Sequence, residues 1–401
     1  IQRHCAALVL GVLAFLFGLG FNYQIFEDQA RVLYILVLAV LVAVLVVGST
    51  HKGHKSWFDL PFFSFQPAEL ARISVILILA AFLVARSRRI QDVSTVLLSL
   101  GVAGPMMFLI IKQPDFSTAI TFFPILLCML FCAGANIGHL LTLAGYGLLT
   151  GAMPLLYTYC QVRYPQPTHG SLPYFVLQTS RMTTTTAVVL VAVAGLCLMA
   201  WRLSIWLRTQ ARAIYFIAIP LIFAASLLSG MLINQQLKGY QRNRFVAYVA
   251  PETDIQGAAY HVHQSQIAIG SGGLWGKGLF SGTQGQLGFL PERHTDFVYA
   301  IVGEETGFFG AIAILGLYLL MIWRIVVVAG LARDRYGYLV CSGFAAMFGF
   351  ELFLNVGMCV GLLPVAGIPL PLISYGGSSL VITLWSLGIV GNIYSRRYTL
   401  L

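Results

Sequence analysis

Long apolar stretches alternate with short polar ones along almost the whole chain. A helix that crosses a bilayer needs about 20 predominantly apolar residues, and eleven stretches are close to that length. They cover residues 5–21, 30–48, 67–85, 94–111, 117–134, 139–157, 186–207, 212–235, 299–323, 338–358 and 377–394. This pattern predicts an all-α, polytopic membrane protein with about eleven transmembrane helices, in which residues 1–401 form a single membrane domain.

The composition supports this prediction. Of the 401 residues, 58% are hydrophobic and only 9% are charged, whereas soluble domains carry about 25% charged residues. An ordinary soluble protein is therefore excluded, and so is a disordered one, which requires low hydrophobicity. The seven cysteines form no CxxC motif and mostly lie in apolar stretches, which favours buried side chains over a disulfide framework or a zinc site.

Arginines divide the loops between the spans into two alternating sets. The arginine-rich set contains Arg31, Arg86, Arg88, Arg89, Arg202, Arg208, Arg212, Arg333, Arg335, Arg396 and Arg397. Such loops usually face the cytoplasm, so we predict an external N-terminus, a cytoplasmic C-terminus and two long extracytoplasmic stretches at 158–182 and 236–296. The net charge of +10 is then mainly a topology signal, and we expect no nucleic-acid partner.

The first polar stretch at the predicted outer face precedes the span at 67–85. Pro67 suits the first turn of a helix, and Glu69 lies where the positive end of the helix dipole favours an acid. Arg72 is three positions further on and can pair with Glu69. Glu69 is therefore either a helix-start acid in an ion pair or a ligand contact, and Trp57 is either an interfacial residue or part of the same site.

Lys112 and Asp115 stand between two adjacent spans. Charged side chains at membrane depth are costly unless they are paired or face a cavity. Mutual neutralisation of the two residues and contact with a ligand are both open interpretations.

A glycine-rich stretch runs from Gln264 to Gly278. It does not match the phosphate loop of nucleotide-binding proteins, so no nucleotide cofactor is expected. Its backbone amides, with Lys277 beside them, suit a pyrophosphate, although a tight loop explains the glycines equally well. His261 and His263 alone are too few for a metal site.

Asp296 lies at the boundary between a polar stretch and the apolar span at 299–323. Arg293 and His294 precede it, and Phe297 follows it. A carboxylate at such a boundary can have its pKa raised towards neutrality, as a general base requires. The alternative is an exposed acid paired with Arg293.

Residues 361–379 are apolar but rich in proline and glycine. Irregular backbone at membrane depth is tolerated only where protein or a water-filled cavity surrounds it. We therefore predict a re-entrant segment that lines a groove open to the outer leaflet, with Ser374 and Tyr375 at its polar end.

Taken together, these stretches resemble the SEDS family (shape, elongation, division and sporulation), whose members include RodA, FtsW and SpoVE. The resemblance extends over residues 2–397. The motifs that carry it are, in family order, QPAEL, KQPDFSTA, GYQRNR, QSQIAIGSGGLWGKG, GTQ, LPERHTDF, GEETGFFG and GLLPVAGIPLPLISYGGSS. IAIGSGG followed by GTQ is more similar to the elongation member, RodA, than to the division member, FtsW.

The resemblance implies a peptidoglycan glycosyltransferase in the bacterial cytoplasmic (inner) membrane. Such enzymes polymerise lipid II, a disaccharide-pentapeptide on undecaprenyl pyrophosphate, at the outer face, and they work with a class B penicillin-binding protein of the elongation machinery. The essential aspartate of the family corresponds to Asp296. Cations or a divalent metal, Mg or Mn, would stabilise the leaving pyrophosphate. The substrate-binding candidates are Trp57, Glu69, Lys112, Asp115, Arg242, Arg244, Gln264, Ser265, Lys277, Gln284, Arg293, His294, Ser374 and Tyr375.

The chain departs from the family pattern in its number of spans. Family members usually have ten. Aligned with this pattern, the sequence is expected to lack the first span, and residues 158–211 are predicted to be an insertion that carries an extracytoplasmic loop and an extra span. Glu351 in the middle of a span has no family counterpart, and we expect it to pair with Asn355 one turn on. Two other functions remain open: a lipid II flippase, and a non-catalytic scaffold for a penicillin-binding protein.

Overall fold

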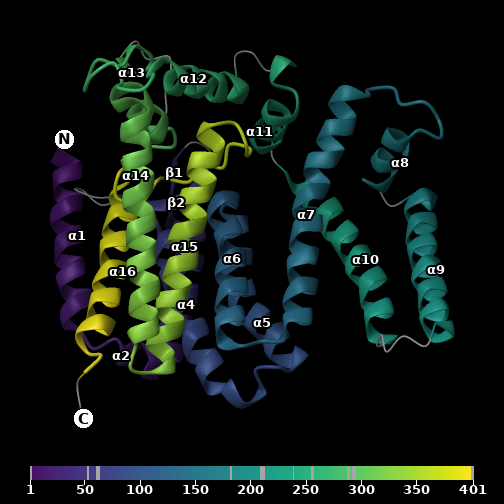
Figure 1. Ribbon diagram of the computed structural model, residues 1–401, viewed down its shortest axis with the longest axis horizontal. Helices are drawn as coiled ribbons and strands as arrows, with labels where there is room; N and C mark the ends of the chain where they lie inside the picture. Colours follow the sequence, from purple (N-terminus) through teal and green to yellow (C-terminus); the bar gives the residue numbers. More distant parts are fainter. Residues whose placement is uncertain are drawn as a thin grey trace. The chain divides into compact units, whose positions relative to one another are not determined.

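The computed structural model describes residues 2–51, 54–59, 64–180, 183–207, 213–237, 239–253, 257–286, 290 and 295–398. These residues divide into two compact units. Unit 1 comprises residues 1–136 and 261–401, and unit 2 comprises residues 137–260. Almost all of the regular structure is helical (Figure 1).

Unit 1 is a bundle of long helices around α4. Its long helices are α1 (Gln2–Gly20), α3 (Ala30–Val47), α4 (Pro67–Ala85), α5 (Val93–Lys112), α6 (Phe116–Ala133), α14 (Val298–Leu331), α15 (Arg335–Cys359) and α16 (Gly377–Ser395). Helices α3, α5, α6, α15 and α16 all pack against α4, so α4 is largely buried inside the protein. The shorter elements are α2 (Gln24–Asp28), η1 (Ser87–Arg89), α12 (Ala258–Ser271), which begins in unit 2, and α13 (Thr283–Gln286).

Unit 2 consists of α7 (Ile137–Arg163), α8 (Leu172–Thr179), α9 (Thr184–Trp206), α10 (Ala213–Gln236), α11 (Gly239–Val249) and η2 (Pro251–Thr253). Helix α7 packs against α8, α10 and α11, and α9 packs against α8 and α10. Met153, Tyr157 and Leu227 form its small apolar core. None of the apolar window of α9 is buried within the protein, as expected for a helix whose surroundings are lipid.

In the described part of the chain, ten helices are long and apolar enough to cross a membrane, where the sequence predicted about eleven. The difference is α1, because its apolar stretch, Cys5–Gly20, is shorter than the others. This helix packs along α16. The predicted insertion at 158–211 contains the end of α7, α8 and α9, and its status as an insertion stays a prediction.

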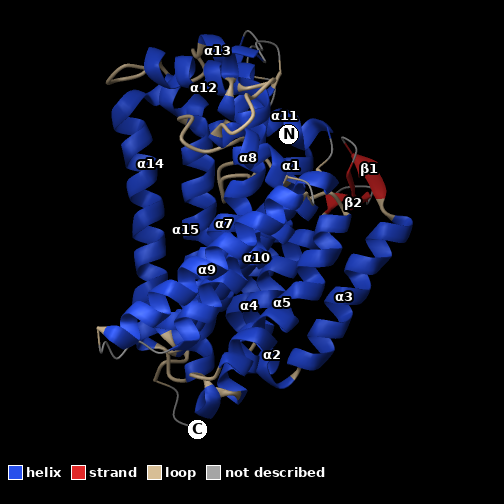
Figure 2. Ribbon diagram, turned by 90° about the vertical axis from the view of Figure 1, so that its right-hand side faces the viewer, coloured by secondary structure: helices blue, strands red, loops and turns tan. Residues whose placement is uncertain are grey.

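The prediction of a purely helical protein missed a small antiparallel sheet between α3 and α4. Its strands are β1 (Ser49–His51), β2 (His54–Asp59) and β3 (Ser64–Phe65), in the order β1-β2-β3. The sheet lies at the end of α3 (Figure 2). Strands this short have no periodicity that sequence can reveal, and their pairing depends on the chain reversing between two helices.

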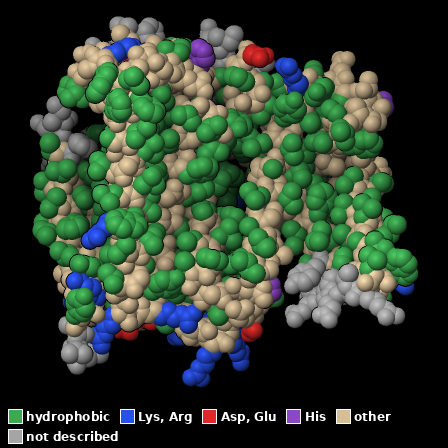
Figure 3. Space-filling view, viewed as in Figure 1, with side chains coloured by type: hydrophobic (Ala, Val, Ile, Leu, Met, Phe, Trp, Pro, Cys, Tyr) green, Lys and Arg blue, Asp and Glu red, His purple; other side chains and the backbone are tan. Residues whose placement is uncertain are grey.

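Charge is distributed unevenly over the surface of unit 1. Figure 3 shows hydrophobic side chains over the middle of the helices and Lys and Arg side chains gathered at the end that carries α2 and the C-terminus. This arrangement agrees with cytoplasmic arginine-rich loops, and the orientation itself stays a prediction.

Candidate active site

Asp296 lies just before α14, and two side chains hold the backbone of Asp296 and of the preceding residue, Thr295. The side-chain amide of Asn355 on α15 donates a hydrogen bond to the main-chain oxygen of Asp296 at 3.0 Å. The Ser374 hydroxyl donates to the main-chain oxygen of Thr295 at 2.6 Å. The Asp296 side chain is half-buried, and the next residue, Phe297, is buried. Asp296 therefore lies beside a buried apolar residue, and its position at a polar–apolar boundary and its raised pKa stay predictions.

The proline- and glycine-rich segment between α15 and α16 packs against the same point. Asn355 donates a second hydrogen bond, at 2.7 Å, to the main-chain oxygen of Ile368, and Tyr318 of α14 donates to that of Pro371. Ile368 and Leu370 are buried. Residues 360–376 contain no helix, as expected, and the re-entrant path and the groove stay predictions. Ser374 contacts backbone, and Tyr375 is exposed.

Asp115 caps α6 instead of pairing with Lys112. Its carboxylate accepts hydrogen bonds from the amide and the hydroxyl of Thr118, at 3.1 and 2.8 Å. It also accepts one from the side chain of Gln66 at 2.8 Å. The Lys112 ammonium lies over the Phe108 ring, 5.4 Å from its centroid. The interpretation of mutual neutralisation is therefore wrong, since the carboxylate is a helix cap that joins α6 to the start of α4.

Glu69 belongs to a buried network of charges. Arg72 donates to Glu69 on the same helix and to Glu351 on α15, and all three side chains are buried. The predicted Glu69–Arg72 pair is confirmed. The predicted pair of Glu351 with Asn355 is wrong, because Glu351 bonds to Arg72 while Asn355 is engaged by main-chain oxygens.

Lys277 is held by a buried carboxylate on α14. Its ammonium lies 2.8 Å from Oε1 of Glu304. The same oxygen accepts hydrogen bonds from the Thr283 hydroxyl at 3.0 Å and from the backbone N–H of Gln284 at 3.1 Å. The Glu304 side chain is completely buried. Gln284, a predicted substrate contact, therefore uses its backbone in this network.

The glycine-rich loop closes against a break in α14. Gly307 has a left-handed backbone (φ 69°), and a Cβ atom on Gly276 would lie 2.2 Å from the main-chain oxygen of Glu305. The amides of Lys277 and Gly278 donate to the carbonyls of Glu304 and Glu305. Glycine is required here for close packing of two backbones, which favours the interpretation of a tight loop over that of a free phosphate loop.

The other candidates are dispersed. Ser265 is buried and donates to the main-chain oxygen of Cys359 at 2.8 Å, while Gln264 beside it is half-buried. Trp57 is half-buried in β2, where its carbonyl accepts a bond from Ser49 at 3.0 Å. Arg242 and Arg244 lie on α11 in unit 2. Arg293 and His294 lie outside the described residues.

A metal ion would find few ligands in the described ranges. They contain no group of three His, Cys, Asp or Glu side chains that could hold one. Hard cations such as Mg²⁺ and Mn²⁺ are commonly held by carboxylates. Near Asp296, the described carboxylates of Glu304 on α14 and Glu351 on α15 are already bound to cationic side chains. These residues do not fit a protein-built metal centre.

Comparison with known proteins identifies the family of this chain. The model of the FtsW/RodA/SpoVE family, described as "Cell cycle protein", matches residues 1–184 and 166–399. The chain belongs to the SEDS family. Its members include peptidoglycan glycosyltransferases, and this SEDS protein is a multi-pass membrane protein.

Three relatives illustrate the similarity of this SEDS chain to characterised members. Peptidoglycan glycosyltransferase MrdB of Escherichia coli K12 is 33% identical, over 99% of this chain and 86% of its own length. Peptidoglycan glycosyltransferase RodA of Treponema pallidum is 34% identical, over 97% of this chain and 88% of its own. A solved chain of a peptidoglycan synthase complex that polymerises and crosslinks has a TM-score of 0.64 and 28% identity, over 99% and 90% of the two chains.

Sequence reasoning missed the residues that hold the site together. The sequence predicts that Asn355 pairs with Glu351. It shows Gln66 and Thr283 only as members of motifs, with no role of their own. The QPAEL, GTQ and GEETG motifs that contain or adjoin Gln66, Thr283 and Glu304 were the available signals. Nothing in the local pattern around Asn355 indicates that it contacts Asp296.

Proposed function

We propose that this SEDS chain polymerises lipid II into glycan strands, with Asp296 as the general base. The observation that carries the proposal is the attachment of the backbone at Thr295 and Asp296 to two other parts of the bundle, through Ser374 and Asn355 respectively. A base must lie within hydrogen-bonding reach of the substrate hydroxyl, and a misplacement of about 1 Å can lower the rate about a hundredfold. This attachment is what such a role requires.

The reaction transfers a glycosyl group between two lipid-linked substrates. The Asp296 carboxylate accepts the proton of the acceptor sugar hydroxyl, and the hydroxyl oxygen forms a bond to the anomeric carbon of the donor. The bond between that carbon and the donor's pyrophosphate oxygen breaks, and undecaprenyl pyrophosphate leaves as an anion. Cationic groups stabilise this charge. Because the described residues offer no protein-built metal centre, no step is assigned to a metal ion.

The cations differ in how free they are to act on the pyrophosphate. Lys277 shares its charge with Glu304, so its contribution is reduced. Lys112 forms no ion pair within the described ranges, and its ammonium lies over the Phe108 ring. We therefore assign Lys112 the larger part of the stabilisation, and Arg293 is a further candidate.

We also propose that the chain acts in cell elongation, beside a class B penicillin-binding protein in the bacterial cytoplasmic membrane, with its active site facing outward. The motif IAIGSGG followed by GTQ supports the elongation role. The similarity to a chain of a complex that polymerises and crosslinks peptidoglycan supports the transpeptidase partner. The arginine-rich loops support the orientation.

The test is a polymerisation assay with purified protein and labelled lipid II, with and without the transpeptidase partner. We expect a ladder of glycan strands from the wild type and, from Asp296→Asn, a rate at least a hundredfold lower, in the range typical for loss of a general base. Asp59→Asn, a change at an exposed carboxylate on β2, is the matched control and should leave the ladder unchanged. No ladder from the wild type, or an undiminished ladder from Asp296→Asn, would contradict the proposal in favour of a flippase or a scaffold.

A further inference from the structure

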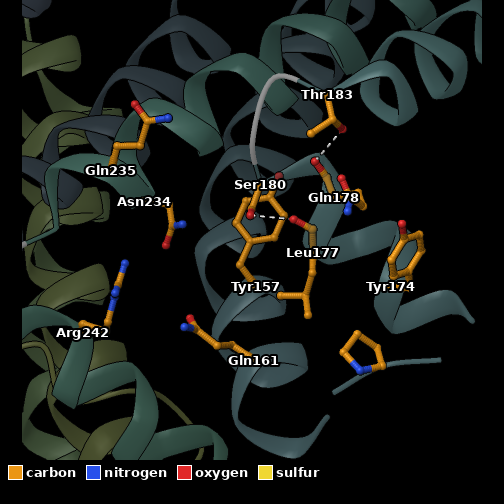
Figure 4. A pocket seen from close by; sticks show the side chains of 11 residues that line it. Tyr157, Gln161, Tyr174, Leu177, Gln178, Ser180, Thr183, Asn234, Gln235 and Arg242 are labelled. Atoms are coloured by element: carbon orange, nitrogen blue, oxygen red, sulfur yellow. Dashed lines mark hydrogen bonds between the residues drawn. The ribbon is translucent and has the colours of Figure 1, made fainter. Parts of the chain in front are cut away.

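Unit 2 contains a cavity to which the proposed reaction assigns no role. Its volume is about 590 Å³, within the range of roughly 300–1,000 Å³ that is usual for small-molecule sites. Its walls come from the ends of α7 and α10, from α8 and α11, and from the segments that flank α8 (Figure 4). It is large enough to hold a ligand of about the size of a disaccharide.

Four amides and one cation line this cavity. They are Gln161 on α7, Gln178 on α8, Asn234 and Gln235 at the end of α10, and Arg242 on α11. In Figure 4, Arg242 and Asn234 lie on one wall, and Gln161 and Tyr157 lie across from them. Within the described part of unit 2, no hydrogen bond or ion pair occupies the side chains of the four amides or of Arg242. Polar side chains that face a cavity without protein partners are available to a ligand.

Two tyrosines among the remaining lining residues are held in place by their neighbours. Tyr157 is buried and donates its hydroxyl to the main-chain oxygen of Thr179 at 3.1 Å. Tyr174 packs against the ring of His169, with centroids 4.8 Å apart. Aromatic faces give a ligand a large apolar contact, while the amides supply the hydrogen bonds.

The charge of the lining narrows the class of ligand. The described lining includes Arg242 as its cation and contains no Asp or Glu. A guanidinium binds carboxylates and phosphates through paired hydrogen bonds. Carboxamides donate to and accept from hydroxyl and acetamido groups at the same time. A ligand that combines these groups is a sugar with acetamido substituents and an acidic group.

We propose that this cavity binds an anionic, N-acetylated sugar, with Arg242 on its acidic group and with Gln161, Asn234 and Gln235 on its hydroxyl and acetamido groups. The choice of ligand rests on the proposed function, because a glycan strand with peptide stems carries all of these groups. Gln161 and Tyr174 come from 158–211, the predicted insertion. The site is therefore one that SEDS proteins without this stretch lack.

Binding of a soluble disaccharide-pentapeptide to the purified full-length chain tests the proposal. We expect the wild type to bind it in isothermal titration, and neutral chitotriose to bind more weakly. Arg242→Gln should weaken binding of the disaccharide-pentapeptide at least tenfold, as loss of a charged hydrogen bond predicts. Gln235→Ala should weaken it about threefold.

Two neighbouring changes serve as matched controls. Gln236→Ala alters an adjacent exposed amide outside the lining, and Arg163→Gln alters an exposed arginine that pairs with Glu252 instead. Both should bind like the wild type. Thermal unfolding of each variant separates loss of binding from loss of the fold.

Three results would overturn the proposal: no binding by the wild type, binding by the Arg242 and Gln235 variants equal to that of the wild type, or equal affinity for chitotriose. Different results would reject the proposed function. A wild-type ladder without binding of the disaccharide-pentapeptide rejects the cavity ligand alone, whereas an undiminished ladder from Asp296→Asn rejects the base alone. Asp296→Asn should still bind the disaccharide-pentapeptide in an Arg242-dependent manner.

Discussion

The side-chain amide of Asn355 bridges the main-chain oxygens of Asp296 and Ile368, at 3.0 and 2.7 Å. One fully buried side chain on α15 thus joins the residue before α14 to the irregular segment before α16. Buried carbonyl groups that lose their hydrogen-bond donor destabilise the folded state. The position of Asp296 therefore depends on a residue that need not touch the substrate.

Replacing Asn355 with Leu should reduce polymerisation more than it reduces the amount of folded protein. The change leaves two carbonyls without this donor, at a cost of about 1–3 kcal/mol each, and lets the Asp296 backbone move. We expect kcat to fall at least tenfold, with a smaller change in KM, when the ladder assay is normalised to folded protein.

Asn392→Leu provides a control of matched chemistry. Asn392 is also a buried asparagine, and it bonds to Leu19 and Tyr23 where α1 and α2 meet α16. The Asn392→Leu variant should have an unfolding temperature lowered to a similar degree, while its folded fraction keeps the kcat of the wild type. Equal loss of kcat in both variants would show that the effect of Asn355 is general destabilisation.

Arg72 should be far less replaceable than Glu351. Arg72→Met leaves the carboxylates of Glu69 and Glu351 buried without their cation, and removing one partner of a buried ion pair costs about 3–5 kcal/mol. Glu351→Leu leaves the Glu69–Arg72 pair in place and should cost less. The combination of Arg72→Met with Glu69→Leu and Glu351→Leu should recover much of the loss, because apolar side chains then replace the whole network.

Resistance to thermal unfolding in a mild detergent measures these differences. If Arg72→Met is no less stable than Glu351→Leu, the network does not contribute as proposed. If the triple replacement is less stable than Arg72→Met alone, the carboxylates are not the source of the cost.

Glu27 should make stability depend on pH in the acidic range. Burial raises the pKa of this carboxyl on α2, and the charges of Asp334 and Asp28 raise it further. The pKa of Glu27 is higher in the folded state than in the unfolded state. The stabilising contribution of its protonated carboxyl to the folded state is therefore fully present below the unfolded-state pKa. It is lost as the pH rises through the folded pKa.

Glu27→Gln tests this sign directly. The variant should unfold at a higher temperature than the wild type at pH 7, and the difference should vanish near pH 4. Asp92→Asn, a change at an exposed acid beside η1, is the control and should not reproduce this pH dependence. A lower unfolding temperature for Glu27→Gln at pH 7 would reverse the predicted sign.

The helices of this protein could be predicted closely because each one satisfies a local condition. The apolar stretch at 67–85 became α4 with the same bounds, and 94–111 became α5 with one more residue at each end. A bilayer offers no partner for the backbone, so a long apolar stretch must form its own hydrogen bonds as a helix. The three short strands were missed because their bonds are made between separate segments of chain.

The residues of the site could be named from sequence, but their partners could not. Asp296 and the loop around Lys277 stand in motifs that the sequence shows directly. Their partners lie far away along the chain: Asp296 and Asn355 are 59 positions apart, and Lys277 and Glu304 are 27 apart. Periodicity places a side chain on its own helix and says nothing of which helix packs against it.

The sequence by itself therefore determined the membrane class, almost all of the spans and the family motifs, because these follow from local hydrophobicity and from residue order. Only the tertiary structure decided that Asp115 caps a helix, that Glu304 neutralises Lys277 and that Asn355 holds Asp296. Buried polar groups must find hydrogen-bond partners wherever packing brings them. That packing is a property of the whole bundle and of no single helix.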